Sequence, residues 1–440
     1  MKVMKFGGTS VGSPERMKHV AHLVTKSGEP TFVVLSAMAG TTNSLIEISN
    51  YLYKKNPEGA NEVINLLEAK YFGHVEELYS TDEYKSITRD FLRQEFQYLR
   101  SFTKELFTSF EEKSIVAQGE IISTNMVVNY LKETGINAIL LSAFDFMRTD
   151  KNSEPDSEYI KEKLANVMKQ NEGYQVYVTQ GFICRNAYGE VDNLLRGGSD
   201  YSASLIGAAL SADEIQIWTD IDGMHNNDPR IVDDTEAVHQ LNFEEAAELA
   251  YFGAKILHPT CVQPAKFAGI PVRLLNTMDP DAHGTIIDNV IMRGKIKAVA
   301  AKDNITAIKI KSSRMLLATG FLRKIFEIFE SYDTPIDMIA TSEVGVSMSI
   351  DNNKHLNDIV DELKKFGTVT VDQDMCIVCV VGDLDWANLG FETLATEAMK
   401  NIPVRMISYG GSNYNISFLI RETDKKQALK NLSDVLFKGQ

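Results

Sequence analysis

Two glycine-rich turns in the sequence carry side chains suited to phosphate chemistry. The first is Lys5-Phe-Gly-Gly-Thr-Ser10, and the second is Arg196-Gly-Gly-Ser-Asp200, which precedes a small, apolar helix expected over residues 201–210. Glycines allow backbone N–H groups to approach phosphate oxygens closely. A lysine at a strand end and the positive end of a helix dipole both favour a phosphoryl group in transfer. The two turns together predict a site for a phosphorylated ligand.

The spacing of these turns excludes two common phosphoryl-transfer frameworks. The Walker A pattern GxxxxGK[ST] is absent, and so are the GxGxxG and HRD motifs of protein kinases. Asp200 also suits the role of a helix-cap residue, and that interpretation stays open. An arginine and two glycines directly ahead of Asp200 are more than a cap requires.

Two further segments add polar groups that can bind a nucleotide. The loop from Thr219 to Arg230 is rich in Asp and turn residues, which suits a nucleotide and its metal ion as well as a plain loop. Lys255 follows Gly253 at the end of a helical pattern, where the helix dipole favours a cation even without a ligand. Both interpretations stay open for the loop and for Lys255.

A parallel sheet covered by helices would position these residues. In the first 275 residues, short apolar runs alternate with longer helical patterns, which is typical of an α/β fold. Strands are expected at 3–6, 32–35, 138–141, 176–179, 215–218 and 272–275, and helices at about 120–135, 243–252 and 259–269. Polar residues or glycines follow each strand. Because parallel strands deliver their carboxyl ends to one edge of the sheet, these residues predict a single site there.

Composition places the chain among ordinary globular proteins of two or three domains. It has 440 residues, of which 44% are hydrophobic and 24% charged, and 45 Lys plus Arg against 60 Asp plus Glu give a formal charge of -15. Such an acidic surface disfavours nucleic-acid binding. No apolar stretch is long enough to span a membrane and the start lacks the apolar core of a signal peptide. We therefore expect a cytoplasmic protein with no membrane and no nucleic-acid partner.

The cysteines do not indicate a disulfide framework or a metal site. Cys376 and Cys379 form a CxxC motif, but it lies in the apolar run Cys-Ile-Val-Cys-Val-Val. Residues three apart on a strand point to opposite faces and cannot share a metal ion. No metal-ligating residues are therefore predicted.

After about residue 300 the pattern changes to shorter units in the order strand, helix, strand, strand, helix, strand. An amphipathic helix is expected at 321–332. Its apolar stripe consists of Phe321, Leu322, Ile325, Phe326 and Phe329. The segment 335–339, Pro-Ile-Asp-Met-Ile, matches 403–407, Pro-Val-Arg-Met-Ile. A period of about 70 residues is too long for a solenoid and predicts two packed copies of a small βαββαβ domain.

Taken in order, the motifs of the chain resemble those of the aspartate kinases. They are Lys5-Phe-Gly-Gly-Thr-Ser, Leu35-Ser-Ala-Met-Ala-Gly-Thr-Thr-Asn43, Gln118-Gly-Glu120, Arg196-Gly-Gly-Ser-Asp200, Trp218-Thr-Asp220, Asp228-Pro-Arg230 and Phe252-Gly-Ala-Lys-Ile-Leu-His-Pro259. The C-terminal repeat resembles the paired ACT domains of the same family. The resemblance thus covers essentially the whole chain.

The resemblance implies an amino-acid-kinase fold, with a parallel-rich sheet between helix layers, over residues 1–290. It implies a regulatory region over 291–440 with two ferredoxin-like ACT domains, at about 312–383 and at about 384–440 plus the strand near 305–311. The implied reaction converts ATP and L-aspartate to ADP and 4-phospho-L-aspartate, the first step towards lysine, threonine and methionine. ATP and Mg²⁺ are the implied cofactors, and no fused homoserine dehydrogenase is expected.

Residue roles follow from the resemblance position by position. Lys5 and Lys255 would stabilise the transferring phosphoryl group, and Asp200 would organise the lysines and the metal-nucleotide. Arg196 would hold the α-carboxylate of aspartate and Glu120 its amino group. The remaining substrate contacts would be Ser36, Thr42, Phe182 and Ser199. The nucleotide would contact Lys5, Gly7, Gly8, Thr219, Asp220, His225, Arg230 and Lys255. An amino-acid effector, with lysine first, would contact Met315, Ala318, Asp337, Thr341 and Ser342.

A carboxylate acceptor agrees with the residue types at these positions. A free aspartate side chain has a pKa near 4, so it is already a nucleophile at neutral pH and needs no general base. The difficulty is that an anionic carboxylate must approach an anionic phosphate. Lysines, Mg²⁺ and helix N-termini are the expected means of neutralising that repulsion.

Rival functions stay open at the level of sequence. A glutamate or N-acetylglutamate kinase would share the lysine and glycine chemistry, although Arg196 with Glu120 favours a free amino acid. A non-catalytic amino-acid sensor would keep the ACT pair, although intact Lys5, Asp200 and Lys255 argue against a decayed kinase domain. Because ACT domains commonly pair between chains, a homodimer or homotetramer is expected.

The sequence departs from the family pattern at two of these positions. His225 lies where the family often has a tyrosine, and Ala318 replaces a polar residue in the effector set.

Overall fold

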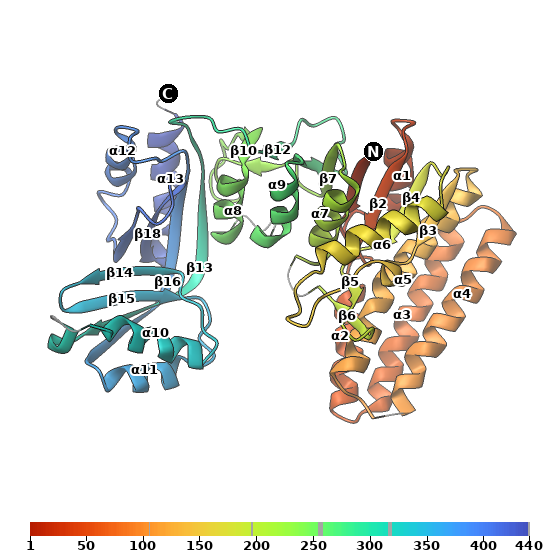
Figure 1. The fold of residues 1–440 in the computed structure, drawn as a ribbon, viewed down its shortest axis with the longest axis horizontal. Helices are drawn as coiled ribbons and strands as arrows, with labels where there is room; N and C mark the ends of the chain where they lie inside the picture. The colour runs from red at the N-terminus through yellow and green to blue at the C-terminus, as the bar shows by residue number, and fades with distance from the viewer. Residues whose placement is uncertain (105, 195–196, 254–257, 316–318, 439–440) are drawn as a thin grey trace. The chain divides into compact units, whose positions relative to one another are not determined.

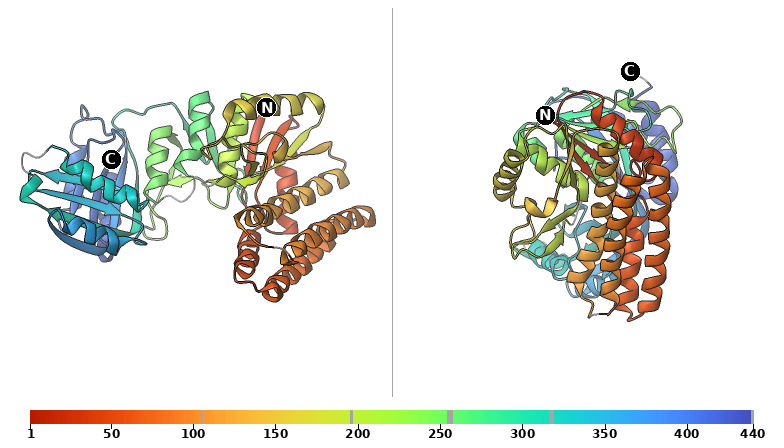
Figure 2. Two further views of the ribbon diagram at one scale, coloured as in Figure 1. Left: turned by 60° about the horizontal axis from the view of Figure 1, so that its bottom comes forward. Right: turned by 90° about the vertical axis from the view of Figure 1, so that its right-hand side faces the viewer.

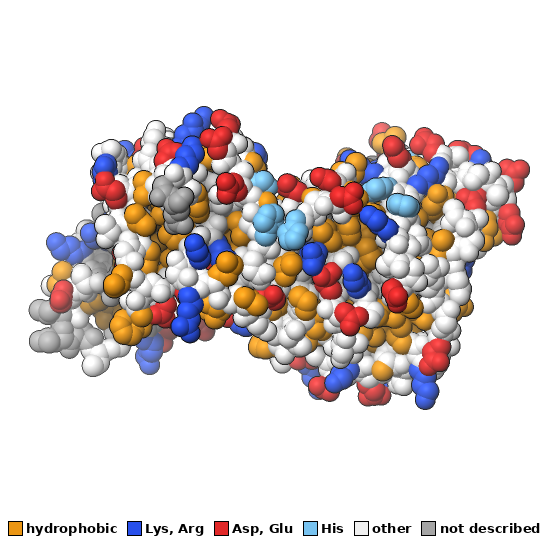
Figure 3. Space-filling model, turned by 90° about the horizontal axis from the view of Figure 1, so that it is seen from above, with side chains coloured by type: hydrophobic (Ala, Val, Ile, Leu, Met, Phe, Trp, Pro, Cys, Tyr) orange, Lys and Arg blue, Asp and Glu red, His pale blue; other side chains and the backbone are white. Residues whose placement is uncertain are grey.

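The computed structural model describes residues 1–104, 106–194, 197–253, 258–315 and 319–438 (Figure 1). The chain divides into two compact units. The first comprises residues 1–224 and 257–289, and the second comprises 225–256 and 290–440. In the described part of the chain, no helix is both long and apolar enough to cross a membrane. On the face seen in Figure 3, acidic and basic side chains are interspersed.

A largely parallel sheet forms the centre of the first unit. Within this unit the strand order is β12-β11-β7-β1-β2-β4-β3, and only β12 runs antiparallel to its neighbour. The strands are β1 Lys2–Phe6, β2 Thr31–Leu35, β3 Ala138–Leu141, β4 Val176–Gln180, β7 Glu214–Thr219, β11 Val272–Asn276 and β12 Thr285–Asp288. The six strands expected from apolar runs are therefore confirmed, and they are the parallel ones. A hairpin of β5 Ile183–Arg185 and β6 Val191–Asn193 follows β4.

Helices cover both faces of this sheet, which explains why the strands read as continuous apolar runs. The helices of the first unit are α1 Pro14–Thr25, α2 Thr41–Tyr53, α3 Pro57–Leu78, α4 Asp82–Ser101, α5 Ser109–Glu133, α6 Ser157–Gln170, α7 Gly198–Leu210 and α9 Gln263–Ala268. Helices α2 to α5 run alongside one another (Figure 2) and share a buried core with α1. Helices α3 and α4 have no counterpart among the elements expected from the sequence.

Two helix starts differ from the expected ones. Helix α5 begins at Ser109, not near residue 120, because Thr108 and Glu111 form a capping box that satisfies the free N–H groups there. Helix α7 begins at Gly198, three residues before the expected start. Its N-cap is Gly197, which adopts a left-handed backbone with φ 69°.

The second unit contains one antiparallel sheet with the order β14-β15-β13-β16-β18-β17. Its strands are β13 Ile296–Lys311, β14 Met338–Ser342, β15 Gly345–Ile350, β16 Thr368–Gly382, β17 Met406–Ser408 and β18 Asn415–Arg421. Its helices are α8 Phe243–Tyr251, α10 Phe321–Ser331, α11 Leu356–Lys364, α12 Phe391–Ala398 and α13 Lys425–Leu436. The two long strands β13 and β16 contribute to two separate hydrophobic cores, one for each copy of the repeat.

The apolar stripe of α10 differs in one residue from the expected one. Phe326 is exposed, and Ile328 is buried instead beside Ile325 and Phe329. At 100° per residue, position 328 returns to the buried face defined by 321 and 325, whereas position 326 turns away from it.

Candidate active site

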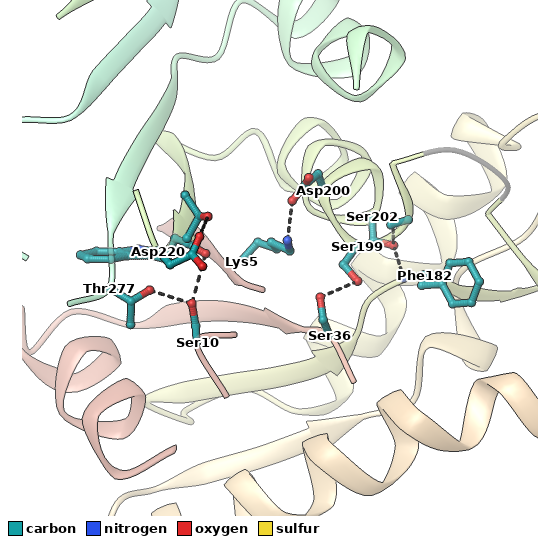
Figure 4. Close-up of polar contacts among 12 residues, drawn as sticks. Lys5, Ser10, Ser36, Phe182, Ser199, Asp200, Ser202, Asp220 and Thr277 are labelled. Atoms are coloured by element: carbon teal, nitrogen blue, oxygen red, sulfur yellow. Dashed lines mark hydrogen bonds and ion pairs between the residues drawn. The ribbon is translucent and has the colours of Figure 1, made fainter. Parts of the chain in front are cut away.

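An ion pair joins the two glycine-rich turns at the carboxyl edge of the sheet. The Lys5 Nζ, at the end of β1, lies 2.6 Å from an oxygen of Asp200 in the first turn of α7 (Figure 4). Their side chains are only 11% and 17% exposed. A salt bridge so shielded from water holds both groups in one geometry, so the ammonium group of Lys5 has a fixed position at the site.

The alternative role of Asp200 as a helix cap is wrong. Because α7 begins at Gly198, Asp200 lies inside the first turn, and its carboxylate pairs with Lys5. The cap position itself has no side-chain hydrogen bond to the helix. The N-terminal N–H groups of α7 thus have no side-chain cap, and the positive end of the helix dipole favours an anion at this point.

Beside this ion pair lies a cavity of about 370 Å³. It is lined by Gly8, Ser36, Ala37, Met38, Ala39, Gly40, Thr42, Asn43, Glu120, Phe182, Gly198 and Ser199. Five of the six residues expected to hold the substrate are in this set, and Arg196, the sixth, lies outside the described residues. The cavity also includes Asn43 and the backbone from Ala37 to Gly40, which the residue-by-residue expectations did not include. The motif Leu35–Asn43 contained a signal for them, because a strand end followed by small and polar residues is typical of a binding loop.

Glu120 gives the cavity a buried acidic group. One of its carboxylate oxygens, Oε1, accepts the Ala37 N–H at 3.2 Å, and the other, Oε2, is buried with no hydrogen-bond partner among the residues that the structure describes. Burial raises the pKa of Glu120 to about 7, although the Ala37 N–H opposes that rise. A buried oxygen without a partner is suited to a cationic group of a ligand, since the unmet hydrogen bond is costly.

Two short hydrogen bonds hold the wall of the cavity that Ser36, Phe182 and Ser199 form. The Ser36 hydroxyl donates to Ser199 Oγ at 2.9 Å, which connects β2 to the start of α7. Phe182 adopts a left-handed backbone with φ 66°, and its N–H donates to Ser202 Oγ at 2.9 Å. Figure 4 shows both contacts on the side of α7 next to the ion pair. A side chain in so uncommon a backbone conformation is held by its surroundings, which is frequent at functional sites.

Gly8, in the glycine-rich turn that begins at Lys5 (the lysine turn), contacts the wall of the cavity. The Ala39 N–H donates to the Gly8 carbonyl at 3.0 Å. A Cβ atom on residue 8 would lie 2.7 Å from the Ala37 carbonyl oxygen, closer than such contacts occur in proteins. Only glycine therefore allows the two segments to approach this closely.

The expected nucleotide contacts are divided between the two units. Thr219 is the last residue of β7 and Asp220 follows it in the first unit, where the Thr219 hydroxyl donates to the Asp220 carboxylate at 3.1 Å. The Gly7 N–H donates to the Trp218 carbonyl at 3.2 Å, so the lysine turn lies against the end of β7. His225 and Arg230 belong to the second unit. Arg230 forms a two-pronged ion pair with Asp228 there, and Lys255 lies outside the described residues.

The expected effector residues lie in the second unit, except Ala318, which is outside the described residues. Asp337, whose side chain is 1% exposed, accepts hydrogen bonds from Lys302 Nζ at 2.8 Å and from the Tyr251 hydroxyl at 2.7 Å. Thr341 and Ser342 are exposed on β14, and Met315 lies in a short 3-10 helix. Lys302 and Tyr251 were not expected here, because they lie 35 and 86 positions from Asp337 in the sequence and share no motif with it.

Comparison with known proteins gives matches over nearly the whole chain. Residues 1–276 match the model of the amino acid kinase family, and residues 378–436 match a model of the ACT domain. The chain is 35% identical to aspartokinase 1, chloroplastic, of Arabidopsis thaliana, over 99% of this chain and 80% of that protein. The crystal structure of E. coli aspartokinase III in complex with aspartate and ADP (R-state) is similar with a TM-score of 0.85 at 31% identity, covering 99% of this chain and 100% of that one. The same enzyme in complex with lysine and aspartate (T-state) gives a TM-score of 0.82 at 32% identity, covering 99% of both chains.

The raised pKa of Glu120 predicts a pH-dependent effect of Glu120→Gln on stability. In the folded protein this carboxyl keeps its proton up to about pH 7, whereas the unfolded chain loses it near pH 4.5. As the pH rises from about 4.5 to about 7, the unfolded chain loses this proton while the folded protein keeps it, so the free energy of unfolding of the native protein falls. Glutamine stays neutral at every pH, so the Glu120→Gln variant does not undergo this fall. We expect Glu120→Gln to gain roughly 1–3 kcal/mol over the native protein between about pH 5 and about pH 8.

Denaturant unfolding at several pH values measures this difference. Trp218 fluorescence in a Trp386→Phe background reports on the first unit alone, since the sequence has two tryptophans. The exposed Glu172→Gln serves as the control and should show no pH-dependent gain. A difference for Glu120→Gln that is constant with pH would contradict the raised pKa.

Proposed function

This chain belongs to the aspartokinases of the amino acid kinase family and phosphorylates L-aspartate with ATP, and from that premise we propose which of its residues carry the transfer. The observation that carries the proposal is the Lys5–Asp200 ion pair beside a cavity that contains the buried Glu120. A cation for the phosphoryl group and an anion for the amino acid thus lie in the same unit, at the same edge of the sheet.

The transfer needs positioning and charge neutralisation more than proton chemistry. The side-chain carboxylate of L-aspartate is ionised at neutral pH and attacks the γ-phosphorus of ATP without a general base. Lys5 would offset the charge that develops on the transferred group, while Asp200 holds the ammonium in place. The start of α7, whose residues Gly198 and Ser199 line the cavity, would direct its free N–H groups towards the same negative charge.

The cavity would recognise both α-substituents of the amino acid. Glu120, whose Oε2 has no partner among the described side chains and backbone, would accept the ammonium group, and the cation would in turn favour the ionised form of the carboxyl. Arg196, which is outside the described residues, would bind the α-carboxylate from the turn ahead of α7. Ser36, Thr42, Phe182 and Ser199 would enclose the remainder of the substrate.

ATP would lie along the turn after β1 and the end of β7. Gly7 and Gly8 present their backbone there, and Thr219 ends β7 with Asp220 directly after it. His225, Arg230 and Lys255 would complete the nucleotide contacts. Mg²⁺ typically takes phosphate oxygens, waters and one or two carboxylates as ligands, so a site with Asp200 next to the phosphates suits it. When bound, Mg²⁺ would neutralise part of the phosphate charge.

The substitution Lys5→Ala tests the catalytic assignment. Without the ammonium group, the charge of the transition state is not offset, and we expect turnover to fall by roughly two to four orders of magnitude. A coupled assay of ADP release with L-aspartate measures turnover, and thermal unfolding checks the fold. Lys2→Ala, at the exposed start of the same strand, is the control and should keep native turnover. Native turnover of Lys5→Ala would remove Lys5 from the mechanism.

The substitution Arg196→Ala tests how the substrate is held. We expect the KM for L-aspartate to rise at least roughly tenfold and the KM for ATP to stay nearly constant, because a charge-assisted contact to the α-carboxylate is lost. Arg185→Ala in the neighbouring hairpin is the control, since Arg185 donates to the Gly189 carbonyl of its own hairpin. If the two variants have the same KM for L-aspartate, Arg196 does not bind the α-carboxylate. L-glutamate as substrate distinguishes this site from that of a glutamate kinase.

For regulation, we propose that lysine binds the second unit at Asp337 and reaches the catalytic residues through α8. The similar E. coli enzyme has been crystallised with lysine. In this chain Asp337 already binds the protein's own ammonium group at Lys302, and it also accepts the hydroxyl of Tyr251, the last residue of α8. An effector cation at Asp337 would alter both contacts. Tyr251 precedes Lys255 by four residues, so a shift of the end of α8 reaches a catalytic lysine.

Binding and inhibition by L-lysine test this route separately. Millimolar L-lysine should raise the melting temperature and inhibit turnover, since a ligand of the folded state stabilises it. Asp337→Asn should lose both effects, whereas Tyr251→Phe should keep the rise in melting temperature and lose most of the inhibition. Asp351→Asn, which removes the other carboxylate of Lys302, is the control and should keep both. A native response of Asp337→Asn would contradict the site, and no response of the native protein would make threonine the next candidate.

Two further properties belong to this proposal. We propose a homo-oligomer that forms through the ACT region, because Ile339 and Ile407, at equivalent positions of the repeat, both expose apolar side chains. We also propose a cytoplasmic location, where the four buried cysteines would stay reduced, as they are in the structure.

A further inference from the structure

A buried hydrogen bond connects the long helix α3 to the segment that lines the binding cavity. Tyr71, in the middle of α3, is fully buried, and its hydroxyl lies 2.8 Å from the hydroxyl of Thr41. Thr41 is the first residue of α2 and is itself fully buried. The residues on both sides of it, from Ala37 to Gly40 and at Thr42 and Asn43, line the cavity.

The cavity-lining segment is held from two sides. From α5, the Glu120 carboxylate accepts the Ala37 N–H, and a Cβ atom on Gly119 would lie 2.7 Å from the Ala37 side chain. From α3, Tyr71 holds Thr41. The first contact fixes the beginning of the segment and the second fixes its end, where the chain enters α2.

The end of this segment depends on Tyr71 because the helix start lacks a side-chain cap. The N-cap of α2 is Gly40, which has a left-handed backbone with φ 83° and no side chain to bind the first N–H groups. The Thr41 N–H donates to the Met38 carbonyl at 3.0 Å, which closes the turn but does not orient the helix. The Thr41 hydroxyl connects this helix start to α3 by a short, buried hydrogen bond, whereas the other side-chain contact from α3, Lys70 Nζ to the Ala39 carbonyl at 3.5 Å, is exposed.

We propose that Tyr71 is a positioning residue for aspartate recognition. Through Thr41 it fixes the direction in which α2 begins, and so the positions of Thr42 and Asn43 in the cavity wall. The inference rests on the proposed role of the cavity as the aspartate site. It also gives the helices α3 and α4 a function in this kinase: they form the buried support, with Phe96 of α4 packed near the ring of Tyr71, against which the substrate loop is held.

The alternative is that Tyr71 only stabilises the hydrophobic core. The two roles predict different kinetics, because a purely structural residue changes the amount of folded protein and not the affinity of the folded enzyme for one substrate. Tyr79 provides a matched comparison. It is also buried, it directly follows the last residue of α3, and its hydroxyl donates to the Met126 carbonyl at 2.8 Å, away from the cavity-lining residues.

Steady-state kinetics of Tyr71→Phe, Thr41→Val, the double variant and Tyr79→Phe test the proposal in the full-length protein. We expect Tyr71→Phe and Thr41→Val each to raise the KM for L-aspartate by roughly 3- to 30-fold, with the KM for ATP within about twofold of native. The double variant should be no worse than either single variant, because both remove the same bond. Thr41→Ser keeps the hydroxyl and should restore the native KM. Tyr79→Phe should lower the melting temperature and leave the KM for L-aspartate unchanged.

Two outcomes would overturn the proposal. In the first, Tyr71→Phe behaves as Tyr79→Phe does, with lower stability and a native KM for L-aspartate. In the second, the effects of Tyr71→Phe and Thr41→Val on this KM are fully additive. If Tyr71→Phe does not fold, Thr41→Val against Thr41→Ser tests the same bond from its other end. Glu120→Gln, measured in parallel, distinguishes a failure of the proposed aspartate site from a failure of the proposed role of Tyr71. A native KM for L-aspartate in that variant would remove the cavity as the aspartate site, whereas a raised KM there with a native KM in Tyr71→Phe would overturn the inference alone.

Discussion

The rest of the structure depends on keeping a cationic group in a fixed place where two anions must meet. A free lysine side chain samples many rotamers, and fixing it costs conformational entropy. The ion pair with Asp200 offsets this entropy cost, because the Asp200 carboxylate lies 2.6 Å from the Lys5 ammonium and both groups are largely shielded from water. The two residues are 195 positions apart, so the pair forms only when β1 and α7 are placed side by side by the parallel sheet. The sheet therefore places Lys5 next to Asp200.

The cavity beside that pair contains a buried carboxyl group, that of Glu120, whose charge is opposite to that of Lys5. Glu120 is buried, one of its oxygens has no partner within the described part of the chain, and its pKa is raised to about 7 because the charged form is poorly solvated. Such a group is a poor structural element and a good receptor for an ammonium group, since binding supplies the missing partner. The close approaches at Gly8 and Gly119 bring the lysine turn, the loop after β2 and α5 into contact. Under the proposed function, this charge and these close approaches would favour a small zwitterion next to the Lys5 ammonium group.

The sequence was sufficient to predict the strands of the sheet and most residues of the cavity, but not the contacts that hold the cavity wall in place. Six apolar runs became six parallel strands because burial on both faces leaves an unmistakable pattern. Ser36, Thr42, Glu120, Phe182 and Ser199 line one cavity because they follow strand ends or lie in short motifs. Tyr71 could not be identified in the same way, since one tyrosine in the apolar stripe of a helix looks like any core residue. The contact of Asp337 with Lys302 and Tyr251 was also beyond reach, because it depends on a tertiary arrangement of three separate elements.

The position of α8 gives a physical reason for regulation at a distance. By its contacts the segment 225–256 belongs to the second unit, where α8 packs on β13 and β16, although the family model that covers residues 1–276 counts it as part of the kinase. Lys5 is held by the sheet of the first unit, whereas Lys255, the second lysine proposed to act on the phosphoryl group, follows in sequence after α8, which packs on the sheet of the second unit. A change at Asp337 can reach that helix through the Tyr251 hydroxyl without disturbing the Lys5–Asp200 pair. Because an ion pair and a hydrogen bond at one buried carboxylate are short-range contacts, a shift of less than an ångström at this point is enough to change both.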